Sequence, residues 1–324
     1  MKRTPTLHMA IFPLLLSLLA LIACATPDAD DLPTEVGPLQ LERVDEGVYA
    51  LIGSIDARSA ENLALNANYG IVVGDDGVLV IDAGASPAGA RVIEEAVARV
   101  TDRPIRWVMN TGSQDHRWLG NSHFAEQGVE IIALERTAET QEGFIDNHLE
   151  RLSGALPSDE IERIRPLTAE DPVADDAYEL DIGGQSVELR YFGDSHFPGD
   201  AVVWLPERQV LFSGDLVYVD RLLGIHPWTD VESKRDAFNA VMAAYDPAII
   251  VPGHGQVTDQ AGARAATGDY LDLLVDGVAA DARDWVPMEE VMERYREPEA
   301  FRELEHFDDW HPRNINRVYL EFEG

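Results

Sequence analysis

One pattern occurs four times in this chain and constrains its fold more than any other: an apolar run ends in a short segment of small residues that carries His or Asp. Loops at strand ends hold the chemistry of open α/β folds, and His and Asp are typical ligands of a shared metal ion. We therefore expect the four segments to meet at one site of an α/β fold. They are residues 110–121 (NTGSQDHRWLGN), 193–196 (GDSH), 213–215 (SGD) and 252–255 (PGHG).

The N-terminus has the layout of an export signal. Two basic residues, Lys2 and Arg3, precede an apolar run over residues 9–23. This run is shorter than the ~18 residues that usually span a bilayer, so we interpret residues 1–23 as a signal peptide and not as a membrane helix.

Cys24 follows the signal and is the only cysteine of the chain. The sequence Leu-Ile-Ala-Cys at residues 21–24 resembles the lipobox of bacterial lipoproteins, whose Cys becomes the lipidated first residue; an ordinary cleaved signal is the alternative. The lipobox implies a protein at the periplasmic face of the bacterial cell envelope that touches the membrane through its lipid anchor only. Residues 24–38 then form the lipidated Cys and an acidic tether, and no disulfide or Cys metal ligand is available to the domain.

The charge of the chain argues against two classes of partner. It carries 59 acidic and 25 basic residues, a formal net charge of -34. Such a field repels nucleic acid and anionic lipid headgroups, and we attribute it to a surface adapted to a salty environment. The hydrophobic content of 45% is sufficient for a sizeable core. The oligomeric state is unknown from the sequence.

The strand patterns fall into two related units. A hairpin over residues 69–81 ends at Asp82, and a second hairpin over residues 201–212 ends shortly before Asp215. Two β-rich halves, each covered by helices, predict an α/β fold: an αββα four-layer sandwich with mixed sheets and the site along one edge between them. Further expected strands are 41–44, 48–52, 105–109, 130–134, 187–192 and 248–251, and expected helices are 137–156, 158–164, 231–245 and one that begins at Pro87 after the cap Ser86.

These motifs resemble those of the metallo-β-lactamase superfamily. Residues 82–84 (DAG) and the last three of the four segments match four of the family's five recurrent motifs in order and spacing. The chain is most similar to the bacterial periplasmic hydrolases related to sulfur-oxidation and quinoprotein-relay proteins, a branch that residues 311–319 also resemble. The resemblance implies that residues 39–324 form a metallo-β-lactamase-like domain with C-terminal helices. It also implies a zinc-dependent hydrolase that acts on a small-molecule ester, lactone, thioester or lactam.

The fifth motif, His-x-His-x-Asp-His in the family, is altered here. Without a gap, Gly112 and Gln114 replace the first two His, His116 replaces the Asp, and Arg117 replaces the last His. With a shift of one residue, Asp115 and His116 take the Asp-His positions. In both registers the two-His half is lost, because glycine has no side-chain donor and glutamine is a weak neutral ligand.

We therefore expect at most one tightly held zinc ion. His116, Asp215 and His254 supply its ligands, with Asp115 in the shifted register, and His196 either joins them or acts as an acid/base group. Zinc would act as a Lewis acid on water and on the scissile carbonyl. Asp115 or Asp215 would orient the water, and His196 would protonate the leaving group.

Four more residues are expected to support these ligands or to line the substrate pocket: Asp82, Gln114, Arg117 and Tyr218.

A second class of function remains possible beside the hydrolase, because a fold can be kept after its catalytic site is lost. The loss of two His is consistent with a non-catalytic envelope lipoprotein that binds a small molecule or a protein partner through the same fold.

Overall fold

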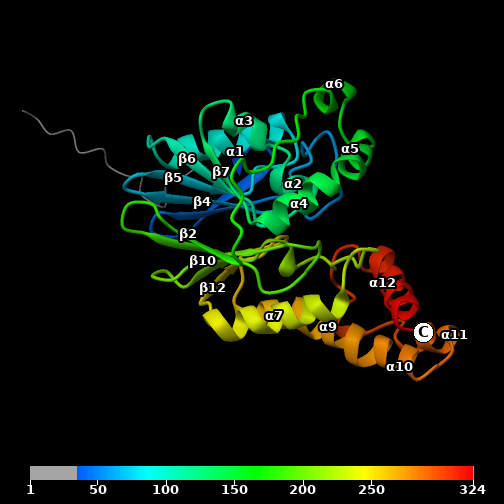
Figure 1. Cartoon of the computed structure of the whole chain (residues 1–324). Coiled ribbons are helices and arrows are strands. Elements are labelled where there is room, and N and C mark those ends of the chain that lie inside the picture. Colours follow the sequence, from blue (N-terminus) through cyan, green and yellow to red (C-terminus); the bar gives the residue numbers. More distant parts are fainter. Residues whose placement is uncertain (1–34, 324) are drawn as a thin grey trace, which may run out of the picture.

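The computed structural model describes residues 35–323, which form two β-sheets packed face to face with helices on both outer faces (Figure 1). This is the expected αββα sandwich, so the predicted fold class is confirmed. The predicted signal peptide, Cys24 and most of the acidic tether lie outside the described residues. Among the residues described, no helix is both long and apolar enough to cross a membrane.

The first sheet has seven strands that lie in the order of the sequence. Its first five strands are antiparallel neighbours, whereas β5, β6 and β7 are parallel. The strands are β1 (Glu35–Val36), β2 (Leu39–Asp45), β3 (Val48–Ile52), β4 (Tyr69–Gly74), β5 (Gly77–Ile81), β6 (Ile105–Met109) and β7 (Glu130–Ile132).

Helix α1 (Pro87–Val100) covers the outer face of this sheet. The Ser86 side chain accepts a hydrogen bond from the backbone N–H of Gly89 at 3.2 Å, and Pro87 occupies the first helical position. Both features are those that the sequence predicted for the helix start. The short helices α2 (Asp115–Trp118) and α3 (Asn121–Ala125) follow β6.

The second sheet has five strands in the order β12-β11-β10-β9-β8, with a parallel pair formed by β11 and β12. Its outer face is covered by α7 (Val231–Tyr245) (Figure 1). The edge strand β8 was not predicted, because none of its residues is buried and it has no apolar run. The strands are β8 (Ala177–Asp181), β9 (Ser186–Arg190), β10 (Val202–Leu205), β11 (Val210–Phe212) and β12 (Ile249–Val251).

The strand expected over residues 130–134 ends at Ile132. The helix expected over residues 137–156 is divided into two helices. Helices α4 (Glu135–Gly143) and α5 (Ile145–Ser153) meet at Phe144, whose φ of -108° and ψ of 5° are not helical. The Phe144 ring packs edge-on against Phe197 at 5.1 Å and Trp228 at 5.0 Å. A tertiary contact therefore overrides the helical pattern, next to a glycine of low helix propensity. A third helix, α6 (Ser158–Ile161), follows.

The side chains of β5 show how the layers are joined. Val78 and Val80 belong to the cluster that packs against α1, whereas Leu79 and Ile81 belong to the cluster between the two sheets. All four side chains are buried. The prediction that this apolar strand is buried on both faces is thus confirmed.

A helical C-terminal region packs on the second sheet through one large cluster of buried side chains. Asn314 in its last helix accepts a hydrogen bond from Ile225 N at 2.7 Å and donates one to Leu223 O at 2.8 Å. This region therefore fixes the loop that runs past the candidate site. It comprises α8 (Gln260–Ala263), a π-helical turn (Arg264–Gly268), α9 (Asp269–Asp272), a second π-helical segment (Leu273–Ala279), α10 (Ala280–Arg283), α11 (Met288–Arg294) and α12 (Phe307–Phe322).

The core between the sheets can be tested with a pair of leucine substitutions. Leu79→Ala removes a fully buried side chain and leaves a cavity, so we expect the free energy of unfolding to fall by about 2–5 kcal/mol. Leu320→Ala is the control, because 47% of that side chain is exposed. Urea denaturation measures both, and equal losses would contradict the assigned layers.

Candidate active site

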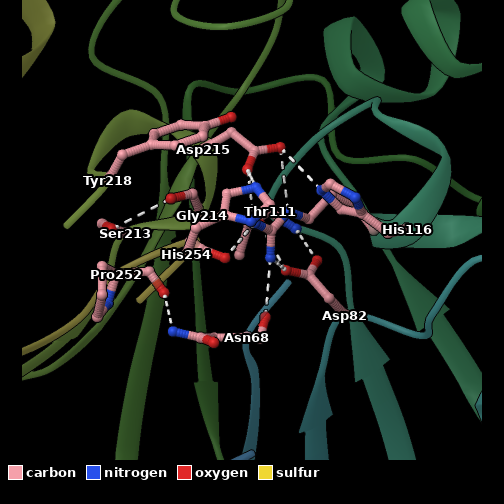
Figure 2. Close-up of polar contacts among 12 residues, drawn as sticks. Asn68, Asp82, Thr111, His116, Ser213, Gly214, Asp215, Tyr218, Pro252 and His254 are labelled. Atoms are coloured by element: carbon pink, nitrogen blue, oxygen red, sulfur yellow. Dashed lines mark hydrogen bonds and ion pairs between the residues drawn. The ribbon is translucent and has the colours of Figure 1, made fainter. Parts of the chain in front are cut away.

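The site lies at one edge of the sandwich, where four parallel-paired strands end (Figure 2). Asp82 follows β5, Thr111 follows β6, Asp215 follows β11 and His254 follows β12. The carboxyl ends of two parallel pairs, one in each sheet, thus deliver these side chains to a common point. The four segments predicted to share a site meet here, since His196 from the remaining segment approaches Gln114 and Tyr218.

The Asp215 carboxylate is the centre of the site. Its Oδ1 accepts a hydrogen bond from Arg117 Nη2 at 2.6 Å, and its Oδ2 accepts one from Arg117 Nε at 3.2 Å. The Nε2 atoms of His116 and His254 lie 3.3 Å and 3.1 Å from the two carboxylate oxygens. Burial alone would raise the pKa of Asp215, but the positive charge of Arg117 holds this pKa well below its usual range.

Arg117 is almost fully buried, and its guanidinium donates five hydrogen bonds. Besides the two to Asp215, they go to Asp82 Oδ2 at 2.9 Å, Asn68 O at 2.9 Å and Gly253 O at 3.2 Å. Five donors in a rigid planar fork are matched here by two carboxylates and two carbonyls. Arg117, which takes the last His position in the ungapped register, therefore brings a permanent positive charge into the site.

Asp82 forms the other side of this ion pair. It accepts hydrogen bonds from Thr111 N and Thr111 Oγ1, both at 2.7 Å, and from Arg117. Burial raises the pKa of Asp82 to about 6, an effect that Arg117 and Thr111 oppose. Asp82 thus connects β5 with the loop after β6 and supports the site without facing its open ligand positions.

Asp115 is held by Arg58 and by the backbone of His116. Its Oδ1 contacts Arg58 Nη2 and accepts a hydrogen bond from His116 N at 2.7 Å. The metal-capable group consists of His116, Asp215 and His254, whose ligand atoms lie within 4.8 Å of one another, and it does not include Asp115. This geometry is consistent with the ungapped register, in which His116 takes the position of the family's Asp. Burial alone would raise the pKa of Asp115, but Arg58 and His116 hold it below its usual range.

Gly112 takes the position of the family's first His in the ungapped register, and the space beside it is already filled. A Cβ atom at this position would lie 2.6 Å from Asp200 Oδ1. Asp200 is held there by Phe197 N, which donates to its Oδ2 at 2.8 Å. Asp200 was missed in the sequence, since an Asp after Pro198 and Gly199 looks like an ordinary turn residue.

Gln114, at the second His position, bridges the two halves of the site. With its amide oxygen towards Arg58 Nη2 (2.9 Å), its nitrogen donates to Asp215 Oδ2 and to His196 Nε2, both at 3.1 Å. His196 is buried, and its Nδ1 has no hydrogen-bond partner among residues 35–323. The structure thus places His196 beside Gln114 and outside the group of three metal-capable residues.

His254 has the proton arrangement of a metal ligand. Its Nδ1 lies 2.7 Å from the backbone oxygen of Asn66, which only accepts hydrogen bonds, so Nδ1 carries the proton. The lone pair of Nε2 then faces Asp215 Oδ1. Burial holds the pKa of His254 well below its usual range, so a second proton is unfavourable. Two acceptors that face each other in this way fit a divalent cation between them.

His116 has the opposite arrangement. Its Nδ1 lies 3.0 Å from Arg58 Nη2, and a guanidinium only donates, so Nε2 carries the proton and donates to Asp215 Oδ2. To bind a metal through Nε2, His116 must lose this contact with Arg58 and change tautomer. After this change the three residues fit one ion. A second ion lacks ligands, because Gly112 has no side-chain donor and the Arg117 guanidinium only donates.

Aromatic side chains pack against the histidines of the site. The Tyr218 ring stacks on His254 with centroids 4.5 Å apart, and the His226 ring lies 4.8 Å from His196 and stacks on Trp228. Figure 2 shows Tyr218 on the Asp215 side of the site, above His254. Tyr218, predicted as a pocket residue, thus contacts one of the metal-capable side chains directly.

A comparison with protein families agrees with this geometry. Residues 63–254 match the model of the metallo-beta-lactamase superfamily. The matched region ends at His254, so the helices over residues 260–322 lie outside it.

Three curated relatives illustrate the similarity. The chain is 28% identical over 191 residues to 2,4-dinitroanisole O-demethylase subunit alpha of Nocardioides sp. (strain JS1661), a match of 56% of this chain and 51% of that protein. The chain thus spans about half the length of that relative. It is 26% identical to metallo-beta-lactamase IND-1 of Chryseobacterium indologenes, a match of 59% of this chain and 72% of that protein. It is 24% identical to metallo-beta-lactamase type 2 of Bacillus cereus, a match of 82% of this chain and 94% of that protein.

Solved structures share the fold. A metallo-beta-lactamase from Pontibacter korlensis superposes with a TM-score of 0.58 at 21% identity, covering 72% of this chain and 99% of that one. The DIM-1 metallo-beta-lactamase gives a TM-score of 0.56 at 19% identity, with 74% and 99% covered.

The importance of the buried guanidinium can be measured directly. Arg117→Met leaves Asp82 and Asp215 without their cation, so we expect the free energy of unfolding to fall by about 3–5 kcal/mol. Urea denaturation in the presence of a chelator measures this loss. Arg165→Met, at a largely exposed side chain, is the control and should change the value by less than about 0.5 kcal/mol. A similarly small effect of Arg117→Met would show that the ion pair does not hold the site together.

Proposed function

This chain belongs to the metallo-beta-lactamase superfamily, and we propose that it is a hydrolase with one divalent metal ion held by His116, Asp215 and His254. The observation that supports this proposal most directly is the position of the buried His254 ring, whose Nδ1 lies 2.7 Å from Asn66 O and whose Nε2 lies 3.1 Å from Asp215 Oδ1. Imidazole nitrogen and carboxylate oxygen are the donors that zinc prefers, so zinc is the proposed ion.

The residues of the chain have separate tasks in this proposal. When bound, the ion would supply Lewis acidity towards water and the scissile carbonyl. Arg117 holds the Asp215 carboxylate in place, and Asn66 O and the Tyr218 ring fix the imidazole of His254. Such preorganisation lowers the cost of reaching the reactive geometry.

His196 is the proposed group that passes a proton to the leaving group. Burial holds its pKa well below the usual value, so it is neutral before the reaction. It is linked to Asp215 through the amide of Gln114. A neutral imidazole beside the reacting centre can take a proton from water and return it to a leaving oxygen or nitrogen.

The substrate class extends from esters, lactones and thioesters to lactams. Two of the relatives above are called metallo-beta-lactamases, and a third is called a 2,4-dinitroanisole O-demethylase subunit. A panel for this chain therefore includes a chromogenic ester, a lactone, a cephalosporin and 2,4-dinitroanisole.

A specific observation favours the alternative of a non-catalytic binding protein. Both oxygens of Asp215 already accept hydrogen bonds from Arg117, and His116 donates to one of them. The Asp215 carboxylate therefore has hydrogen-bond donors on both oxygens without a metal ion. A protein that binds no metal and turns over no member of the panel would support the binding function instead.

Metal analysis tests the proposal. Purified protein equilibrated with zinc should hold at most one ion per chain, and a chelator should abolish turnover of the panel. His254→Ala removes a ligand and should abolish both binding and turnover. His123→Ala is the control, because His123 pairs with Glu94 on α1, away from Asp215. Two zinc ions per chain at full occupancy would contradict the proposed site.

We also propose that the protein is anchored in the bacterial cell envelope through lipidated Cys24, on the basis of the lipobox-like residues 21–24. Cys24→Ala should move the protein from the membrane fraction to the soluble fraction after expression in a bacterial host. Metabolic labelling with a fatty acid should mark the parent protein and not the Cys24→Ala variant. Ser153→Ala is a control outside the signal. Equal labelling of the parent and the Cys24 variant would contradict the anchor.

A further inference from the structure

Lys234 is a buried lysine in a chain that hardly uses lysine. The sequence has 25 basic residues, and only two of them are lysines, Lys2 and Lys234. Lys234 lies on α7, and its side chain is fully buried. Lysine is almost never fully buried unless its ammonium group is paired, so the contacts of this side chain need an explanation.

The ammonium group of Lys234 forms no ion pair with any of residues 35–323. Its Nζ instead donates hydrogen bonds to Asp215 O at 2.5 Å and to Ser195 Oγ at 3.3 Å. It also lies 5.5 Å from the centroid of the Tyr218 ring. A buried ammonium group without an ion pair costs free energy, so the stability of the fold does not account for this residue.

The three contacts of this lysine belong to different segments of the site. Asp215 follows β11, and Ser195 precedes His196 in the loop after β9. The Tyr218 ring stacks on His254. One side chain from α7 thus connects the segment of a proposed metal ligand, the segment of the proposed proton carrier and the ring that packs against a second ligand.

The start of α7 holds the His196 segment a second time. Thr229 precedes the N-cap of this helix, and its Oγ1 donates to His196 O at 2.9 Å. The N-cap, Asp230, accepts a hydrogen bond from Ser233 N at 2.9 Å and fixes the first turn. The helix is therefore a rigid support from which Lys234 reaches both segments.

Asp215 and His196 are thus joined by two bridges. Their side chains are linked by the Gln114 amide, which donates to Asp215 Oδ2 and to His196 Nε2 at 3.1 Å each. Their backbone segments are linked by Lys234, through Asp215 O and Ser195 Oγ. A single bridge leaves the two side chains free to turn about it, whereas two bridges fix both their distance and their orientation. Partners of this kind orient the groups that perform the chemistry.

We propose that Lys234 is a positioning residue that sets the place of His196 relative to Asp215. The inference rests on the proposed hydrolase function, in which Asp215 holds the ion and His196 carries the proton. In ester hydrolysis the oxygen of water bonds to the acyl carbon, and the bond from this carbon to the leaving oxygen breaks. The leaving oxygen takes the proton that His196 has received from the water. A displacement of about 1 Å can slow such a step about 100-fold.

The leaving group of the substrate reveals this role. Benzyl acetate releases an alkoxide that needs a proton, whereas 4-nitrophenyl acetate releases a phenolate that leaves without one. In the zinc-loaded protein, Lys234→Met should lower kcat/KM about 100-fold for benzyl acetate and less than about 3-fold for 4-nitrophenyl acetate. Methionine has a side chain of similar length without the donors, and metal analysis checks the zinc occupancy of each variant.

Two further variants accompany this measurement. Ser195→Ala removes the far end of the bridge and keeps Lys234, so it should lower the ratio of benzyl to 4-nitrophenyl turnover about 10-fold. Arg235→Met is the matched control and should leave this ratio unchanged. It removes a positive charge at the next position of α7, where the side chain pairs with Asp276. Ser195→Ala also keeps the test decisive if Lys234→Met does not fold.

NMR spectra of chelator-treated protein with isotope-labelled histidine test the positions without turnover. The ring signals of His196 should move in Lys234→Met and in Ser195→Ala. The signals of His123 and His311, whose partners lie elsewhere, should not move.

Urea denaturation of the same chelator-treated protein tests for a purely structural role. The urea midpoint of Lys234→Met should stay close to that of the parent, because the removal of a buried charge offsets the loss of two hydrogen bonds. A purely structural lysine would instead lower the midpoint and slow both esters by the same factor.

The outcomes separate the two proposals. A His196 signal that moves in both variants, in a protein that hydrolyses no member of the panel, would support the positioning role of Lys234 and remove the hydrolase function. Equal slowing of both esters in Lys234→Met would overturn the positioning role and leave the hydrolase. A His196 signal that stays unchanged in both variants would also overturn the positioning role.

Discussion

The ion pair of Arg117 with Asp82 and Asp215 is the interaction on which the site depends. It joins the ends of β5, β6 and β11, and through Gly253 O it also holds the turn after β12. A metal ion can dissociate, but a guanidinium is part of the chain and cannot lose its proton in a protein. The charge that orders these four loops is therefore permanent, and the loops are held whether or not an ion is bound.

The alterations of the family motif form a consistent set. Gly112 leaves room for the Asp200 carboxylate, Gln114 connects Asp215 with His196, and Arg117 neutralises Asp215. These contacts pair both oxygens of Asp215 and both oxygens of Asp200 with donors. Random loss of ligands would instead leave unpaired carboxylates in the interior, which is destabilising. The site is therefore a buried polar network in which His116, Asp215 and His254 could hold the proposed ion.

The sequence predicted those features that follow from local patterns. The fold class, the capped start of α1 and the burial of β5 on both faces were read from apolar periodicity and turn residues, and the structure has them. The roles of Arg58 and Asp200 could not be read in this way, because each depends on a partner far away in the chain and no pattern marks either residue. The register of residues 112–117 was ambiguous for the same reason, since only the space beside Gly112 and the direction of Asp115 distinguish the two alignments.

The acidic surface and the buried ion pairs of the site act over different distances. A net charge of -34 produces repulsion at long range, but salt screens exposed charges beyond a Debye length of about 8 Å at physiological ionic strength. Arg117, Asp82 and Asp215 are buried, so their short contacts are screened much less. In a salty environment the repulsion among surface charges therefore fades while the ion pairs of the site keep their strength, so an acidic surface and a buried ionic site are compatible in one chain.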